Sequence, residues 1–193
     1  MIKIDELNKS FGDTAVFKEF SAEFEDGSVT CIMGSSGIGK TTLLRILMGL
    51  EDYDSGRITG LENKTMAAVF QEDRLCENLT VSANIRMTGG KDEKGISEQE
   101  VVKYLEIIGM KDMAGKQISE LSGGMKRRVA ILRAVLADRD IVFFDEPLKG
   151  LDQETEKKVM ETIVPLLKDK TVLWVTHRED EAAYFKNANM LKL

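Results

Sequence analysis

Short apolar segments separated by turn-forming residues characterise the first third of the chain. Strand-like runs extend over Ile2 to Leu7, Phe17 to Phe24 and Val29 to Met33, and the polar turn Glu25-Asp26-Gly27 separates the last two. Runs of this length, bounded by glycine and acidic residues, are typical of strands joined by tight turns. We therefore predict a small β-rich region at the beginning of the chain.

A helix is predicted directly after this region. Leucines at positions 43, 44, 47 and 50 recur at helical spacing from Lys40 onward, and the turn-like residues Asp54-Ser55-Gly56 follow them. Spacings of three and four residues place apolar side chains on one helix face. A glycine-rich loop lies between this helix and the strand that ends at Met33. The pattern therefore predicts a strand, a glycine loop and a helix in succession.

The middle of the chain has a different, mostly helical pattern. Ala67 to Phe70 is a short strand candidate, Thr80 to Met87 is helical, and Thr88 to Gly95 is a polar loop. Ser97 with Glu100 forms a capping box, and Ser122 opens a helix that extends to about Ala137. We predict a helical subdomain over about residues 71–136.

Strand and helix alternate again in the last third. Ile141 to Phe144 and Val172 to Val175 are apolar strand candidates, and the helical segment from about Gln153 to Lys168 separates them. Pro165 is expected to kink or shorten that helix. Strands that alternate with helices favour an α/β fold with a mostly parallel sheet.

Composition is that of a globular protein. The chain has 193 residues, of which 42% are hydrophobic and 31% are charged, so we expect one domain over residues 1–193. No segment approaches the roughly 18 apolar residues of a spanning helix, and the first ten residues lack the pattern of a secretory signal. Both observations predict a cytoplasmic address. Cys31, Cys76 and the lone His177 have no zinc-site spacing.

The charge balance disfavours a nucleic-acid partner. The sequence has 27 basic and 33 acidic residues and a net charge of −6. One basic cluster, between Ser122 and Ala137, is expected to form a solvated helix face, with contact to nucleic acid or lipid as the alternative. Its members are Lys126, Arg127, Arg128 and Arg133.

The glycine-rich loop carries the strongest chemical signal. It fits the pattern G-x-x-x-x-G-K-[ST] and has the flanking strand and helix that this motif requires. Its backbone N–H groups can surround a triphosphate, Lys40 can reach the β- and γ-phosphates, and the Thr41 hydroxyl can hold Mg²⁺. The alternative is a glycine turn with a chance lysine. The predicted binding residues are Gly34, Ser35, Ser36, Gly37, Ile38, Gly39, Lys40, Thr41 and Thr42.

A second motif supplies two carboxylates. The apolar run Ile141 to Phe144 is followed by Asp145 and Glu146. In phosphoryl-transfer sites such an arrangement places one acid on Mg²⁺ and the next beside the γ-phosphate. We therefore expect Asp145 to bind the metal and Glu146 to polarise the attacking water. Taken alone, the run is equally compatible with a strand that ends in a solvated loop.

The segment Leu121-Ser122-Gly123-Gly124 narrows the interpretation. With the two preceding motifs in this order, the chain resembles the nucleotide-binding subunits of ATP-binding cassette (ABC) transporters over essentially all its length. The resemblance implies an α/β P-loop NTPase with a mostly parallel sheet, an N-terminal antiparallel β subdomain and an inserted helical subdomain. It also implies that Ser122, Gly123 and Gly124 bind the γ-phosphate of ATP held by an opposite subunit; alone, this segment is compatible with an ordinary capped helix.

Further residues match functional positions of that family. By resemblance, Phe11 stacks on adenine, Gln71 is a catalytic residue that senses Mg²⁺, and His177 touches the γ-phosphate. Asp152 would link the two ATP sites, and could also be a helix N-cap. Two positions depart from the family pattern: Met125 replaces a glutamine or glutamate, and Lys149-Gly150 replaces small residues.

The resemblance implies an Mg-dependent ATPase that drives transport through separate integral-membrane subunits. We expect an ATP-dependent head-to-tail homodimer at the cytoplasmic face of the membrane. The stretch after Phe70 is similar to importers of the nitrate, sulfonate and taurine type. The alternative is a non-transport ABC ATPase in DNA repair, chromosome organisation or iron–sulfur assembly, although the short stretch between Lys40 and Leu121 has no coiled-coil or zinc-binding insertion.

Overall fold

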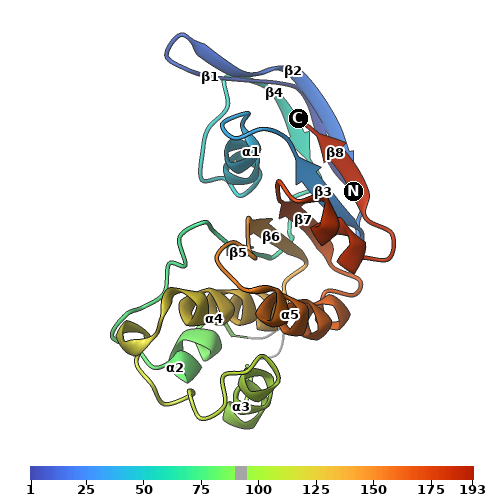
Figure 1. Ribbon diagram of the computed structural model, residues 1–193. Coiled ribbons are helices and arrows are strands. Elements are labelled where there is room, and N and C mark those ends of the chain that lie inside the picture. The colour runs from blue at the N-terminus through green and yellow to red at the C-terminus, as the bar shows by residue number, and fades with distance from the viewer. Residues whose placement is uncertain (90–94) are drawn as a thin grey trace.

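Two β-sheets organise the chain in the computed structural model, which describes residues 1–89 and 95–193 (Figure 1). The first sheet is antiparallel, with the order β2-β1-β4. It contains β1 (Ile2–Phe11), β2 (Thr14–Phe24) and β4 (Ser55–Thr59). The N-terminal antiparallel region that we predicted is therefore present. Part of the predicted polar loop Thr88 to Gly95 lies outside the described residues.

The second sheet has five strands in the order β5-β6-β7-β3-β8, and each of its neighbouring pairs is parallel. Its strands are β3 (Val29–Met33), β5 (Met66–Val69), β6 (Ile141–Asp145), β7 (Thr171–Val175) and β8 (Asn189–Lys192). The central strands β6 and β7 are buried along their whole length. They are continuous apolar runs because both faces of a parallel sheet are covered.

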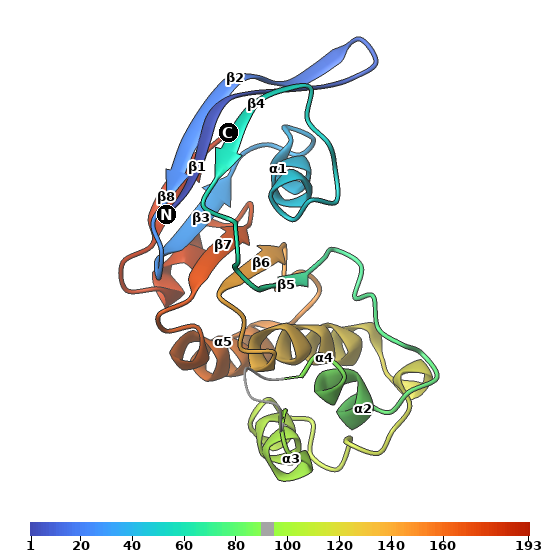
Figure 2. The ribbon, with the colours of Figure 1, turned by 180° about the vertical axis from the view of Figure 1, so that it is seen from behind.

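Helices cover the two faces of the parallel sheet. The helix α1 (Lys40–Leu47) lies on the side of the antiparallel sheet, whereas α4 (Gly123–Leu136) and α5 (Gln153–Leu166) lie on the opposite side (Figures 1 and 2). Beyond α4 are α2 (Val81–Arg86) and α3 (Glu98–Ile107). The described residues also contain two 3₁₀ segments, Ile118–Glu120 and Glu179–Tyr184. This arrangement confirms the predicted α/β class.

Two apolar cores result from these layers. One lies between the antiparallel sheet, α1 and the parallel sheet, and includes Phe24, Leu43 and Phe143. The other joins the opposite face of the parallel sheet to α4, α5 and the smaller helices. Trp174 is fully buried there, with its ring centre 4.6 Å from that of Phe144. Apolar side chains therefore pack against both faces of the parallel sheet. This packing holds in place the strand ends where the candidate site lies.

The structure corrects several predicted boundaries. The strand β4 occupies residues that we expected to form a turn, and neither β8 nor the two 3₁₀ segments was predicted. Pro165 lies inside α5, which ends one residue later. The capping box of Ser97 and Glu100 is present as predicted. Among the described residues, no helix is long and apolar enough to cross a membrane.

Candidate functional site

The loop between β3 and α1 depends on a glycine at the start of the helix. Gly39 is the N-cap of α1 and has φ +115°, a conformation that residues with a side chain rarely adopt. A Cβ atom at this position would lie 2.5 Å from Cγ1 of Val16 and 3.0 Å from Cζ of Phe17. The loop can therefore approach β2 only because residue 39 is glycine. This close approach shapes the entrance to the helix N-terminus.

Lys40 lies beneath the loop, and its ammonium group is already hydrogen-bonded to the loop backbone. Its side chain is 7% exposed, and its ammonium donates hydrogen bonds to the carbonyl oxygens of Gly34, at 2.8 Å, and Ser35, at 2.9 Å. Both acceptors belong to the glycine-rich loop itself. The cation is thus held at the site and can exchange neutral carbonyl partners for charged phosphate oxygens, which form stronger hydrogen bonds.

Thr41 and Asp145 meet across the two elements that carry them. The Thr41 hydroxyl, on α1, donates a 2.8 Å hydrogen bond to Oδ2 of Asp145, at the end of β6. Asp145 is 3% exposed, and its Oδ1 has no hydrogen-bond partner. Burial raises the pKa of the Asp145 carboxyl, although the bond from Thr41 opposes that shift. A buried carboxylate with a free oxygen beside a hydroxyl is a donor set that fits Mg²⁺.

Glu146 is held in an unusual backbone conformation. Its φ is +48°, in the left-handed region that costs a non-glycine residue about 1–3 kcal/mol. Its amide donates to the carbonyl oxygen of Val175, at 3.0 Å. Such conformations persist only where the surrounding structure determines them, and they are common at functional sites. The direction of the Glu146 side chain therefore depends on its neighbours.

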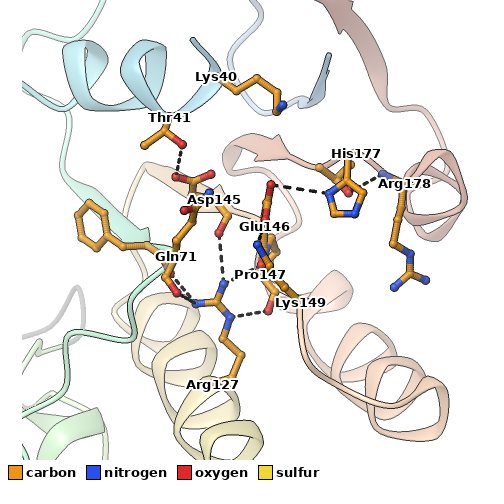
Figure 3. Close-up of polar contacts among 12 residues, drawn as sticks. Lys40, Thr41, Gln71, Arg127, Asp145, Glu146, Pro147, Lys149, His177 and Arg178 are labelled. Atoms are coloured by element: carbon orange, nitrogen blue, oxygen red, sulfur yellow. Dashed lines mark hydrogen bonds and ion pairs between the residues drawn. The ribbon is translucent and has the colours of Figure 1, made fainter. Parts of the chain in front are cut away.

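Two cations or potential cations flank the Glu146 carboxylate. Lys149 Nζ lies 2.9 Å from Oε2, and His177 Nδ1 lies 3.7 Å from Oε1 (Figure 3). Partial burial raises the pKa of Glu146, but Lys149, His177 and Lys40 together outweigh it and leave the pKa below its usual value. The carboxylate is therefore charged near neutral pH, the state that a general base requires.

A cavity of about 250 Å³ brings many of the predicted residues together. Phe11 stands at its edge with a half-exposed ring, and Lys9 Nζ lies 4.4 Å from the centre of that ring. The exposed ring agrees better with a platform for a ligand than with a core position. The lining residues are Phe11, Val16, Ser36, Gly37, Gly39, Lys40, Thr41, Thr42, Gln71 and Glu146.

The signature residues lie elsewhere. Ser122, Gly123 and Gly124 do not line this cavity, and the Ser122 hydroxyl accepts the amide of Met125 at 3.4 Å as the N-cap of α4. Ser122 and Gly123 are exposed. Asp152 is likewise outside the cavity, and caps α5 by accepting the amide of Thr155 at 2.9 Å. Within one chain the signature segment therefore does not line the cavity beside the glycine-rich loop.

The prediction that the basic cluster of α4 forms a solvated helix face is wrong for one of its members. Arg127 is only 5% exposed, so the expected solvated face is wrong for this residue. Its guanidinium lies between the segment after β5 and the segment after β6 (Figure 3). Helical spacing could have indicated this, because Arg127 precedes the buried residues Ile131 and Ala134 by four and seven positions. Buried backbone carbonyls, which no sequence pattern displays, stabilise the cation there.

The other members of the cluster also have partners. Lys126 pairs with Glu77 at 2.9 Å, Arg128 donates to the carbonyl oxygen of Ile108 at 2.9 Å, and Arg133 donates to that of Arg74 at 2.9 Å. These side chains stabilise the helical segment locally. No group of three or more histidine, cysteine, aspartate or glutamate side chains within residues 1–89 and 95–193 could hold a metal ion.

Comparison with known proteins now defines the class. The family described as "ABC transporter" matches residues 17–149. The xylose/arabinose import ATP-binding protein XacJ of Haloferax volcanii is 36% identical over 94% of this chain and 51% of its own length. The aliphatic sulfonates import ATP-binding protein SsuB 1 of Pseudomonas savastanoi is 35% identical over 96% of this chain and 77% of its own length. The chain thus spans about half of the first relative.

Solved structures agree with the sequence comparison. The dimeric bacterial ABC transporter cassette MJ0796 superposes with a TM-score of 0.83 and 27% identity, over 100% of this chain and 94% of that one. The chain belongs to the ABC transporter family. This confirms the resemblance drawn from the glycine loop, the paired carboxylates and the signature segment.

Proposed function

We propose that the chain is the ATP-binding and ATP-hydrolysing subunit of an ABC transporter of the importing kind. The observation that carries the proposal is a cavity lined by Lys40, Thr41 and Glu146. Beside it, the Thr41 hydroxyl donates to the buried carboxylate of Asp145, whose Oδ1 has no protein partner. A buried carboxylate oxygen left unpaired in a fold is costly unless a ligand uses it.

In this proposal each residue has a separate task. Lys40 exchanges its two carbonyl partners for the β- and γ-phosphate oxygens of ATP. Thr41, Asp145 and Gln71 hold Mg²⁺, which, when bound, neutralises charge on those phosphates. Glu146 accepts the proton of the attacking water, and His177 contacts the γ-phosphate. The half-exposed ring of Phe11 supports adenine at the cavity edge.

Partners follow from the position of the signature segment. Ser122, Gly123 and Gly124 are outside the cavity of their own chain, so we propose that they complete the cavity of a second copy in a head-to-tail homodimer. A dimeric relative of the same fold supports this arrangement. Asp152 would then lie near the partner's site. One cassette over residues 1–193, with the helical subdomain over about 71–136, would form each half.

Transport requires membrane subunits besides this chain. The import functions of the named relatives favour this role over a non-transport ATPase. We propose that the chain lies at the cytoplasmic face of the membrane and binds integral-membrane subunits there. The net charge of −6 makes nucleic acid an unfavourable partner.

Titration of ATP and Mg-dependent phosphate release test the proposal. Lys40→Ala should weaken ATP binding about ten- to a hundredfold, because hydrogen bonds to charged groups contribute about 1.5–3 kcal/mol. The matched control is Lys18→Ala, which removes an exposed lysine from β2. Equal ATP affinity in the two variants would mean that the glycine loop is not the nucleotide site. Absence of Mg-dependent phosphate release from wild type would contradict hydrolysis.

A further inference from the structure

Arg127 is a buried cation with several hydrogen-bond acceptors. Its guanidinium donates to the side chain of Asp73 at 3.1 Å and to five backbone carbonyl oxygens. These carbonyls belong to Phe70, Gln71, Asp145, Glu146 and Pro147. Of the six acceptors, one carboxylate alone carries a charge that can balance the buried guanidinium.

The acceptors lie on two segments that are distant in sequence. One segment follows β5 and contains Gln71, and the other follows β6 and contains Glu146. The strands β5 and β6 are parallel neighbours, so their carboxyl ends lie at the same edge of the sheet. Beyond the strand ends the ladder no longer pairs these carbonyls, and the planar fork of an arginine can bind several of them at once. Arg127 thus joins α4 to both strand ends.

Arg127 Nη2 makes a shorter hydrogen bond to the carbonyl oxygen of Glu146 than to that of Asp145. Arg127 Nη2 donates to the Glu146 carbonyl oxygen at 2.6 Å and to that of Asp145 at 3.2 Å, while Nε donates to the Pro147 carbonyl oxygen at 2.8 Å. Three consecutive carbonyls are therefore fixed on one cation. The middle one belongs to the residue with φ +48°. Removal of the guanidinium would release the conformation that directs the Glu146 carboxylate.

We propose that Arg127 is a positioning residue that sets the directions of Glu146 and Gln71 together and ties both to the signature helix α4. This inference rests on the proposed ATPase function for its catalytic consequence, but the structural clamp itself does not depend on it. Arg127 touches neither the cavity nor the Glu146 carboxylate, so its effect on catalysis is indirect.

Two arginines on the same helix provide matched controls. Arg128 donates to carbonyl oxygens of Gly124, Ile108 and Gly109, all within the helical part of the chain. Arg133 donates to the carbonyl oxygens of Asp73 and Arg74, and to none of the residues after β6. Only Arg127, among the three, bridges the segments of Gln71 and Glu146.

Hydrogen exchange without nucleotide tests the clamp directly. The amides of Glu146, Lys149 and Leu151 are bonded to backbone carbonyls in the segment after β6 or in β7. In Arg127→Lys these amides should exchange at least about tenfold faster, whereas Arg128→Lys should leave them within about twofold of wild type. The amides of β3 report whether either variant is globally destabilised. Equal exchange after β6 in the two variants, with β3 unchanged, would overturn the clamp.

Kinetics then test its consequence for catalysis. Arg127→Lys should lower kcat for ATP hydrolysis at least about tenfold and leave the ATP dissociation constant within about threefold, because the cavity lining is retained. In a Glu146→Gln background, the same change should lower the residual rate clearly less than in wild type, since one of the two positioned groups is already absent and only the contribution of Gln71 remains. A purely structural defect would instead lower both backgrounds equally. That result, or unchanged kcat, would overturn the inference.

The two proposals fail in different ways. If wild type does not hydrolyse ATP, the proposed function is wrong, and the exchange contrast between Arg127→Lys and Arg128→Lys still decides whether the clamp exists. If wild type hydrolyses ATP and Arg127→Lys does so at the same rate, the positioning role is wrong and the proposed function remains. Arg127→Gln is the second variant, in case a primary ammonium in this buried place prevents folding.

Discussion

The two regions of the chain that we propose to bind phosphate, the glycine-rich loop with its cavity and the start of α4, are built differently. At the cavity, Lys40 is buried and pairs with the loop carbonyls, and Thr41 pairs with the buried Asp145. At the start of α4, by contrast, Ser122 and Gly123 are exposed, and the serine caps its own helix. An exposed helix start of this kind is suited to binding a ligand presented by another chain, as the proposed dimer requires.

The two regions differ in how much support each needs from the surrounding structure. Near the cavity, the backbone of Glu146 is strained and Oδ1 of Asp145 is unpaired. Both features are unfavourable, and they persist only because the surrounding structure is tightly packed. The signature region needs no such support, because a helix N-terminus with small residues presents free N–H groups by itself. Substitutions should therefore act on chemistry in the first region and on assembly in the second.

The largest effect is expected at Glu146, the proposed general base. Glu146→Gln keeps the shape of the side chain and removes its ability to accept a proton, so turnover should fall at least about a hundredfold. ATP affinity should change little, because Lys40 and the loop remain. Steady-state phosphate release and equilibrium ATP titration measure the two quantities. As a control, Glu154→Gln removes an exposed carboxylate from α5.

Retention of more than about a tenth of wild-type turnover in Glu146→Gln would remove this residue from the mechanism. That result would also contradict the proposed difference between the two regions, because the strained backbone at Glu146 would then have no role in catalysis. A fall in Glu154→Gln of similar size would attribute the loss to general destabilisation.

A smaller effect is expected at the cavity edge. Phe11→Ala should weaken ATP binding about two- to tenfold, since an aromatic stack contributes about 0.5–1.5 kcal/mol. Phe11→Tyr keeps the ring and should be nearly silent. The measurement is ATP titration with and without Mg²⁺, because the loss should be the same in both conditions. Unaltered affinity in Phe11→Ala would show that the ring does not support the base.

The smallest effect is a shift in pH dependence. Lys149 is exposed and lowers the pKa of Glu146, so its removal in Lys149→Ala should raise that pKa. A base with a higher pKa is protonated sooner on acidification, and turnover should therefore begin to fall at a higher pH. We expect a shift of less than about one pH unit, because solvent screens an exposed pair.

Lys149→Arg keeps the positive charge and serves as the control for that shift. The acid side of the turnover profile should stay in place in this variant and move upward in Lys149→Ala. Coincident profiles in all three proteins would show that Lys149 does not act on Glu146 during turnover.

Much of the fold could be predicted because its central elements have strong patterns. The strand β3 has the predicted bounds, and Ser122 caps α4 as predicted. The strands β4 and β8 were missed for a physical reason. Both lie at sheet edges and are largely exposed, so pairing with β1 and with β3 defines them more than apolar residues do.

The candidate site likewise has features that the sequence predicts and features that only the folded chain shows. Its phosphate loop and paired carboxylates follow from motifs, because the chemistry needs those residue types at those spacings. The burial of Arg127 could not be predicted from its charge, since five of its six acceptors are backbone carbonyls that only the folded chain assembles. Backbone acceptors have no sequence signature. The roles of all the site residues stay predictions.

Crosslinking between two differently tagged copies tests the central claim most directly. One copy carries Ser36→Cys, the other carries Ser122→Cys, and both carry Glu146→Gln so that ATP persists. The exposed Cys76 is replaced in both copies. Cys31 can remain, because burial, with a smaller contribution from Glu181, raises the pKa of its thiol to about 11.

A disulfide requires Cα atoms within about 7 Å of each other. If the exposed signature region of one copy completes the cavity of another, oxidation with Mg-ATP should yield a covalent dimer that carries both tags. Without nucleotide the same mixture should stay monomeric on a non-reducing gel. Equal crosslinking with and without ATP, or no mixed dimer under either condition, would contradict the composite site.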